Sequence, residues 1–325
     1  MKKNIWLIVR TAISIGLMAV LLYMMRDSIP KMLMAVKNIP IALIAAAYAI
    51  FALSIVIMSF RLKLLLATKN IFLRFPDFVR LTYIGYFFSS FLPTAVGGDV
   101  VKAFYVSQAS GSAVSSYTTI FMDRFLGMCS LFTLVIAGLI CSKNIPNFGL
   151  NWLMPVILLV CAAMFAFFFN KRFANFSTRI FTPLIPVKVA EKIKKIYAAV
   201  HGFKKHKPRL FQCLLISMTG QAVAFTSAYV IALGLSATVP FKAILLAMPI
   251  ASMASMIPSI YGTGPREMSM VIILSPFAGD DKALAIALLW LGLLLTSAFI
   301  GGIIHLAMGS DKLKTTGLNE NGKGT

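Results

Sequence analysis

Acidic residues are scarce in this sequence: ten Asp and Glu stand against 31 Lys and Arg in 325 residues. Cysteine and histidine are scarcer still, with four and three copies. The cysteines lie singly in apolar runs and the histidines lack metal-ligand spacing, which argues against a disulfide framework or a zinc site. We therefore expect free thiols, no metal and no cofactor.

Charged residues of both signs make up only 13% of the chain, whereas 59% of it is hydrophobic. Such a composition is typical of an all-α polytopic membrane protein and leaves no room for a soluble domain. The net charge of +21 does not indicate nucleic-acid binding, because the basic residues lie between apolar runs. In those places they set membrane topology and attract anionic lipids.

Six apolar runs are predicted to be full membrane spans. The first follows Lys2 and Lys3, and no small-residue cleavage site comes after it, so we expect a retained signal anchor. The six runs cover residues 5–25, 39–60, 113–141, 152–169, 210–235 and 284–308.

Basic residues mark the cytoplasmic side. A loop with an excess of bases runs from Arg61 to Arg80, and eleven bases against one acid occupy residues 170–209. The positive-inside rule places both loops, and both termini, on the cytoplasmic side of the inner membrane. Loop 170–209 also has an apolar helical face, which predicts an amphipathic helix on anionic headgroups; a solvated basic linker fits too. Residues 311–325 are expected to form a disordered cytoplasmic tail.

Two further apolar stretches are interrupted where a span ought to continue. Pro93 and two glycines break residues 81–107 after about a dozen apolar residues, ~18 Å of helix against a hydrocarbon core of ~30 Å. Pro258 and nearby glycines break residues 241–277. Proline lacks a backbone donor and glycine lets the chain leave helical geometry, so both stretches are predicted to be re-entrant helical hairpins. Non-helical backbone at such depth is buried by protein or reached by water, which marks a site.

The two breaks resemble each other. Each has a proline, a glycine four residues later, a second glycine nearby, and then one acid and one base. The loop charges make the first stretch enter from the cytoplasm and the second from outside. This predicts an inverted repeat with halves at 39–169 and 210–309, within one transmembrane domain at 1–310, and a site between the two breaks.

Charges embedded in apolar surroundings are the candidate substrate-binding residues, because such charges pair or face a polar cavity. Helix starts offer free N–H groups that suit a phosphate, and arginine adds bidentate hydrogen bonds. Helix capping by Asp99 and Glu267 is the competing interpretation, as is an interhelical ion pair for Asp123 and Arg124. Gln221 is interpreted as a packing residue. The candidates are Gly97, Gly98, Asp99, Lys102, Asp123, Arg124, Gly262, Gly264, Arg266 and Glu267.

These motifs resemble those of a known family. The patterns are Phe-Leu-Pro-x-x-x-Gly-Gly-Asp at 91–99, Asp-Arg-x-x-Gly at 123–127, Pro-x-x-x-Gly-x-Gly-x-Arg-Glu at 258–267, and Arg61 followed by leucines. Together they are similar to the lysylphosphatidylglycerol synthase transmembrane-region family, the flippase-like half of the multiple peptide resistance factor proteins. The resemblance covers roughly residues 5–310.

The resemblance implies a lipid flippase fold in which Asp99, Arg124, Arg266 and Glu267 line the path of a headgroup. The chain ends shortly after its last span, so we expect a stand-alone member without the aminoacyl-transfer domain of the enzyme members. The favoured hypothesis is a translocase, not an enzyme, that moves an aminoacylated phosphatidylglycerol-like lipid between leaflets; a lipid-linked sugar is another candidate.

Two other hypotheses remain. The first is a membrane enzyme acting on polyprenyl- or phospholipid-linked substrates, with Asp99 and Glu267 as acid and base. The second is an accessory subunit that recruits a lipid-modifying enzyme through the basic loop. No Gly-x-x-x-x-Gly-Lys motif is present, so energy for transport is expected to come from gradients or lipid imbalance.

Overall fold

The computed structural model describes residues 39–90, 97–141, 202–256 and 264–308, together with residues 26, 30, 34, 36 and 37. Within this part of the chain there are eight α-helices and one short 3-10 helix, η3 (Gly202–His206). The predicted spans at 5–25 and 152–169, the tail and most of the basic loop 170–209 lie outside the described residues. The all-α class is confirmed.

Four helices are long and apolar enough to cross a membrane. They have 27 to 29 residues, or about 40 Å at ~1.5 Å per residue. Each corresponds to one of the predicted full spans, which makes the protein a polytopic membrane protein. The four are α3 (Ile41–Ala67), α6 (Ala113–Cys141), α10 (Lys207–Gly234) and α13 (Asp280–Ala307).

Four helices are short, with 14 or 15 residues each, or about 21 Å. They pack in two consecutive pairs, which we call the first hairpin (α4, Phe75–Ser89, with α5, Gly97–Ser110) and the second hairpin (α11, Phe241–Ala254, with α12, Pro265–Ala278). Each hairpin is broken where the sequence predicts a break. The turn residues, 91–96 and 257–263, lie outside the described residues.

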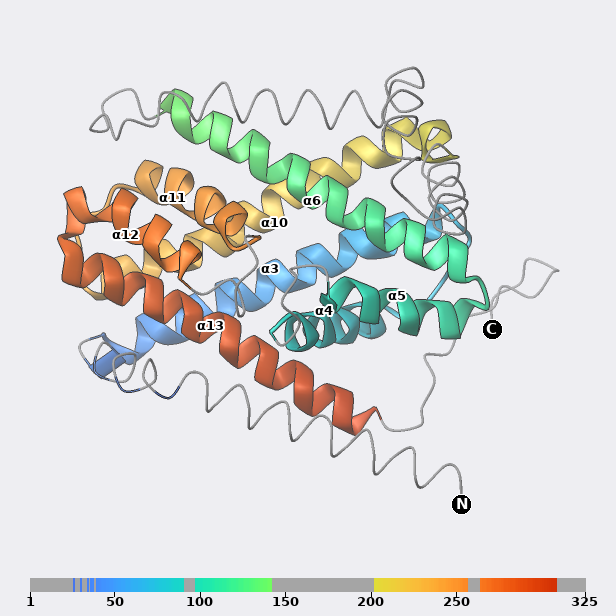
Figure 1. Cartoon of the computed structure of the whole chain (residues 1–325), viewed down its shortest axis with the longest axis horizontal. Coiled ribbons are helices and arrows are strands. Elements are labelled where there is room, and N and C mark those ends of the chain that lie inside the picture. Colours follow the sequence, from blue (N-terminus) through green and yellow to red (C-terminus); the bar gives the residue numbers. More distant parts are fainter. Residues whose placement is uncertain are drawn as a thin grey trace, which may run out of the picture.

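The two hairpins start from opposite ends of the molecule. Helices α3 and α10 run antiparallel along each other, because Ile39 lies beside Gly234 and Met58 lies beside Gly220. The first hairpin follows the end of α3 and the second follows the end of α10, so their bases lie at opposite ends of this pair (Figure 1). We call the ends of the hairpins at Ser89/Gly97 and at Ala254/Pro265 their tips.

The order of helices is long, short, short, long in each half of the described chain. The packing between the halves is reciprocal as well: α4 packs against α13, and α11 packs against α6. Figure 1 shows α6 and α13 on the two sides of the central α3–α10 pair. This is the order that an inverted repeat of halves 39–169 and 210–309 requires; the repeat itself stays a prediction.

Two predicted loops are shorter than expected. Helix α3 continues to Ala67, so Arg61 lies inside a helix and is buried, because an acid on another helix pairs with it. Only Gly279, with φ +76°, separates α12 from α13, and Asp280 and Asp281 form the first turn of α13. Acids in a first turn are favourable there because a helix N-terminus carries partial positive charge.

The main apolar core joins α3, α10 and the second hairpin to α13. At its edge the Trp290 ring meets the Phe51 ring edge-on, with centroids 5.4 Å apart. On α13, a Cβ at Gly301 would overlap the carbonyl oxygen of Tyr83 on α4. Gly301 is therefore a packing residue, since small residues let membrane helices approach closely.

Candidate functional site

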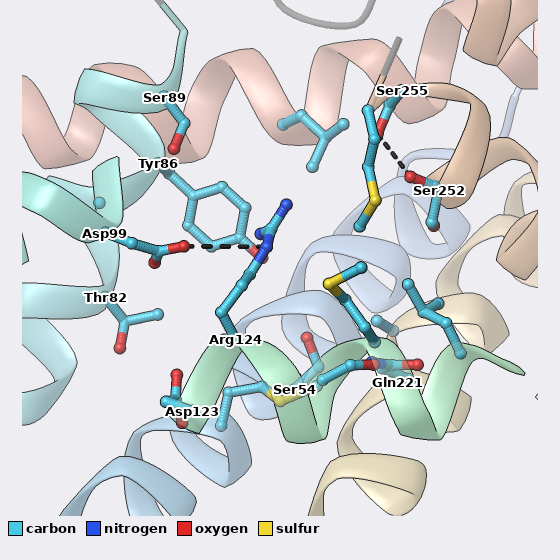
Figure 2. Close-up of a pocket in the computed structure, with 18 of the residues that line it drawn as sticks. Ser54, Thr82, Tyr86, Ser89, Asp99, Asp123, Arg124, Gln221, Ser252 and Ser255 are labelled. Atoms are coloured by element: carbon cyan, nitrogen blue, oxygen red, sulfur yellow. Dashed lines mark hydrogen bonds and ion pairs between the residues drawn. The ribbon is translucent and has the colours of Figure 1, made fainter. Parts of the chain in front are cut away.

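A cavity of about 330 Å³ lies between the two hairpin tips and is lined by all eight described α-helices. Ser89 and Asp99 reach it from the first hairpin, and Ser252 and Ser255 reach it from the second (Figure 2). Arg266 of the second hairpin lines it as well. Its walls are aromatic and aliphatic as well as polar. The charged residues that line it are Arg61, Lys102, Arg124, Arg266, Asp99 and Asp123.

At the first tip, one carboxylate lies between two cations. Asp99 Oδ1 accepts a hydrogen bond from Lys102 Nζ at 3.2 Å, one turn along α5. Its Oδ2 lies 3.8 Å from Arg124 Nε of α6, too far for a hydrogen bond (Figure 2). The predicted N-cap position for Asp99 is wrong, because α5 begins at Gly97 and Asp99 lies within its first turn. Arg124, with 35% of its side chain exposed, is the most accessible of the three.

At the second tip, the acid is satisfied within its own helix end. Glu267 Oε2 accepts a hydrogen bond from the backbone N–H of Gly264 at 2.7 Å. Its Oε1 accepts two hydrogen bonds from Arg266, at 2.6 Å and 2.9 Å. The predicted capping arrangement, with Gly264 before the helix and Glu267 in its first turn, is confirmed. Arg266 lines the cavity, whereas Glu267 does not.

The embedded acid of α6 belongs to a buried network. Asp123 Oδ1 accepts a hydrogen bond from Arg61 Nε at 2.7 Å, and only 8% of either side chain is exposed. Arg61 Nη1 also donates to Ser217 Oγ of α10 at 2.6 Å, and Ser217 contacts Ser130. Asp123 therefore pairs with α3, and Arg124 on the next position turns toward α5. This network ties three long helices together beside the cavity.

The three candidate glycines that the structure describes, Gly97, Gly98 and Gly264, lie at the tips and do not line the cavity. A Cβ at Gly98 would overlap the carbonyl oxygen of Gly85, so α4 and α5 approach each other closely at this point. Gly264 has open space around it and a φ of +91°, which residues with a side chain rarely adopt. Gly97 is buried, and Gly262 lies outside the described residues.

The sequence model of one family, described as "Lysylphosphatidylglycerol synthase TM region", matches residues 7–302. The chain belongs to this family. Membership confirms the resemblance drawn from the motifs and indicates a function related to membrane lipids. A search of curated proteins found no match.

In this member of the lysylphosphatidylglycerol synthase transmembrane-region family, the cavity has an excess of positive charge. Four cationic side chains line it, against two lining acids and Glu267 bound behind Arg266. The Arg61–Asp123 and Arg266–Glu267 pairs are close, at 2.7 Å and 2.6 Å. Asp99 is left to balance both Lys102 and Arg124, so one net positive charge remains at the first tip. Among the described residues, no group of three or more His, Cys, Asp or Glu side chains is placed to hold a metal ion.

The lining residues of this family member that fall outside the predicted set include one charged residue, Arg61, and one amide, Gln221. The bases that follow Arg61 predict a cytoplasmic loop there, whereas its place among the family motifs indicates a site role. For Gln221 the sequence predicts a packing role. Its Nε2 donates to the carbonyl oxygen of Gly127 at 2.9 Å, while its Oε1 is buried without a hydrogen bond. A single amide in an apolar run gives no signal of the face it occupies.

Proposed function

We propose that this chain is a membrane lipid translocase that holds a lipid headgroup in the cavity while the lipid moves between leaflets. The observation that carries the proposal is the meeting of two short hairpins, from opposite ends, at a polar cavity with a loosely paired arginine. At about 21 Å each, the hairpin helices cannot cross a hydrocarbon core of ~30 Å alone. Their tips then lie within the membrane, where charge is stable only when paired or bound to a ligand.

The chemistry of the cavity favours an anionic headgroup. Arg124 lies 3.8 Å from its acidic neighbour, so its guanidinium keeps hydrogen-bonding capacity for a phosphate. The net positive charge of the first tip supports the same choice, as do the positive ends of α5 and α12, which both start at the tips. The volume of about 330 Å³ lies at the small end of ligand pockets, ~300–1,000 Å³, which suits one headgroup and not a long glycan.

Apolar surface beside the cavity suits the acyl chains. On α6, the exposed residues Val114, Tyr117 and Phe121 follow one helical face that ends at Arg124. On α5, Val100 and Phe104 form a matching exposed row that starts next to Asp99. In this mechanism the tails stay in lipid along these rows while the headgroup occupies the cavity. The headgroup thus binds in the cavity, and the tails contact the adjoining apolar rows on α5 and α6.

Hairpins that start at opposite ends provide a route for alternating access. Movement of one hairpin against the long helices opens the cavity toward one leaflet, and movement of the other opens it toward the second. The basic end of α3 and α10 is proposed to face the cytoplasm of a cell with an inner membrane, with both termini on that side. Anionic lipids, and a lipid-modifying enzyme, are the proposed partners of the basic loop.

The decisive experiment measures lipid movement in proteoliposomes made with the purified full chain. A phospholipid with a fluorescent label on one tail is placed in both leaflets, and a reducing agent that cannot cross the membrane destroys the outer label. A translocase lets the inner label disappear as well. Arg124→Gln should slow that phase about tenfold or more, because a charge-assisted hydrogen bond contributes ~1.5–3 kcal/mol.

A matched control keeps the experiment specific. Lys63→Gln removes a positive charge near the end of α3, and Lys63 does not line the cavity. The rate of lipid movement in this variant should match the native rate. Retention of the inner label by the native protein would contradict the proposal. Formation of a new lipid product by the purified protein with an activated donor would instead favour the enzyme hypothesis.

A further inference from the structure

We propose that the headgroup accepted by this cavity must itself donate hydrogen bonds, and that Asp99 and Gln221 select for those donors. The inference rests on the proposed translocase function and narrows its substrate class. In the part of the chain that the structure describes, only two buried side-chain oxygen or nitrogen atoms have no hydrogen bond, Asp99 Oδ2 and Gln221 Oε1. Both residues line the cavity.

The orientation of the Gln221 amide follows from its partner. Gln221 lies on α10, and its side chain reaches the backbone carbonyl oxygen of Gly127 on α6 at 2.9 Å. A carbonyl oxygen can only accept, so the amide nitrogen must be the atom that faces it. The amide oxygen is therefore the atom that turns away, and it can only accept a hydrogen bond. Gln221 thus offers the cavity an acceptor.

The Asp99 carboxylate offers a second acceptor. Lys102 Nζ occupies Oδ1 at 3.2 Å, and the other oxygen has Arg124 Nε at 3.8 Å as its neighbour. When a phosphate binds to Arg124, the guanidinium is drawn to the anion, and Oδ2 needs another donor. In the view of Figure 2, Asp99 and Gln221 lie on the two sides of Arg124. A phosphate on Arg124 then shares the cavity with both acceptors.

The complementary ligand has an anionic phosphate and hydroxyl or ammonium groups beside it. A buried acceptor left unpaired is costly, and sites built to accept a donor reject analogues without one strongly. Glycerol, ethanolamine, aminoacyl and sugar headgroups fulfil the requirement. Headgroups of equal charge with the donors methylated or removed do not. Charge alone would not separate these two classes.

The test uses two pairs of lipids that differ in donors but not in charge. Phosphatidylethanolamine is compared with phosphatidylcholine, and phosphatidylglycerol with phosphatidylmethanol, each with the same labelled tail in proteoliposomes of the full chain. The donor-bearing member of each pair should move at least about tenfold faster. Gln221→Leu should reduce that preference several-fold. Gln212→Leu, an exposed glutamine on the same helix outside the cavity, should leave it unchanged.

A binding measurement separates failure of this inference from failure of the translocase proposal. Trp290 lines the cavity, and replacing Trp6 and Trp152 by phenylalanine leaves it as the sole tryptophan. Its fluorescence is titrated with dihexanoyl-phosphatidylethanolamine and with dihexanoyl-phosphatidylcholine, in which the esterified glycerol carries no free hydroxyl group. Tighter binding of the first without lipid movement would keep this inference and remove the translocase. Equal binding, or equal rates within both lipid pairs, would overturn the inference and mean that water satisfies the two acceptors.

Discussion

The two hairpins are nearly equal in length and meet at one cavity, yet the acidic residues at their tips have different kinds of partner. Glu267 of the second hairpin is bound by Arg266 and by the backbone of its own helix start. Asp99 of the first hairpin is shared with Arg124 on another helix, through a longer contact. The acid of the second tip is therefore held by its own helix start, whereas the acid of the first tip also depends on a neighbouring helix.

This difference assigns different tasks to the two tips. An acid held by its own helix start keeps these hydrogen bonds when the hairpin moves, because Gly264, Arg266 and Glu267 move together. A tip whose acid faces a neighbouring helix changes its contacts when a ligand arrives, since a phosphate competes for Arg124. We therefore expect substitutions of the charged pair at the second tip to affect stability most, and substitutions of Arg124 beside the first tip to affect lipid movement most.

The largest effect is expected at the second tip. Arg266→Ala removes both hydrogen bonds to a buried glutamate oxygen and should lower the free energy of unfolding by ~3–5 kcal/mol, because one charge of a buried pair is left alone. Thermal unfolding in detergent measures this. Adding Glu267→Gln should restore more than half of the loss, since the amide still accepts from Gly264. Arg74→Ala, at an exposed arginine, is the control. An unfolding temperature equal to the native value would contradict the assignment.

At the first tip the expected effect falls on lipid movement. Arg124→Ala should slow movement roughly tenfold to a hundredfold through loss of ~1.5–3 kcal/mol of hydrogen bonding to the phosphate. Its stability should change by less than about 1 kcal/mol, because its partner is 3.8 Å away and a third of the side chain is exposed. Proteoliposome transport and thermal unfolding, run on the same preparation, check both parts. If Arg124→Ala lowered stability and left transport normal, the roles assigned to the two tips would be contradicted.

A smaller effect is expected from the close approach within the first hairpin. Gly98→Ala would push a methyl group against the carbonyl oxygen of Gly85, where backbone atoms cannot rotate away. The cost should be ~2–3 kcal/mol of stability. The shift of α5 also moves Asp99 relative to Arg124, so transport should slow as well. A variant with native stability would show that α4 and α5 are farther apart at this point.

The smallest effect is expected at Gly264, where the constraint is backbone conformation and not space. Gly264→Ala meets no neighbouring atom but must adopt a φ of +91°. The strain should lower stability by ~1–2 kcal/mol. The ratio of donor-bearing to donor-free lipid movement should stay native, because Gly264 does not line the cavity. A changed ratio would place this glycine in the binding surface.

The positions of the hairpins were predictable, because proline and glycine mark breaks in an apolar run by local geometry alone. The capping of α12 was predictable for the same reason, since Gly264 and Glu267 are three residues apart. Arg61 was not, because its burial depends on Asp123, 62 residues away. Gln221 was missed because an isolated amide reveals neither its partner on α6 nor the face that meets the cavity. The predictable features depend on local sequence, whereas the positions of Arg61 and Gln221 depend on partners on other helices.

The proposed mechanism requires that the two hairpin tips enclose a cavity that takes up a phospholipid headgroup. The most direct test introduces Ser89→Cys and Ser255→Cys, one at each tip, in a chain whose native cysteines are replaced. Ser107→Cys, outside the cavity on α5, serves as the reference. A small cationic thiol reagent should modify both tip positions, and added phosphatidylglycerol should slow both reactions and leave the reference unchanged. Tip thiols that do not react, or that react equally fast with the lipid present, would contradict the claim.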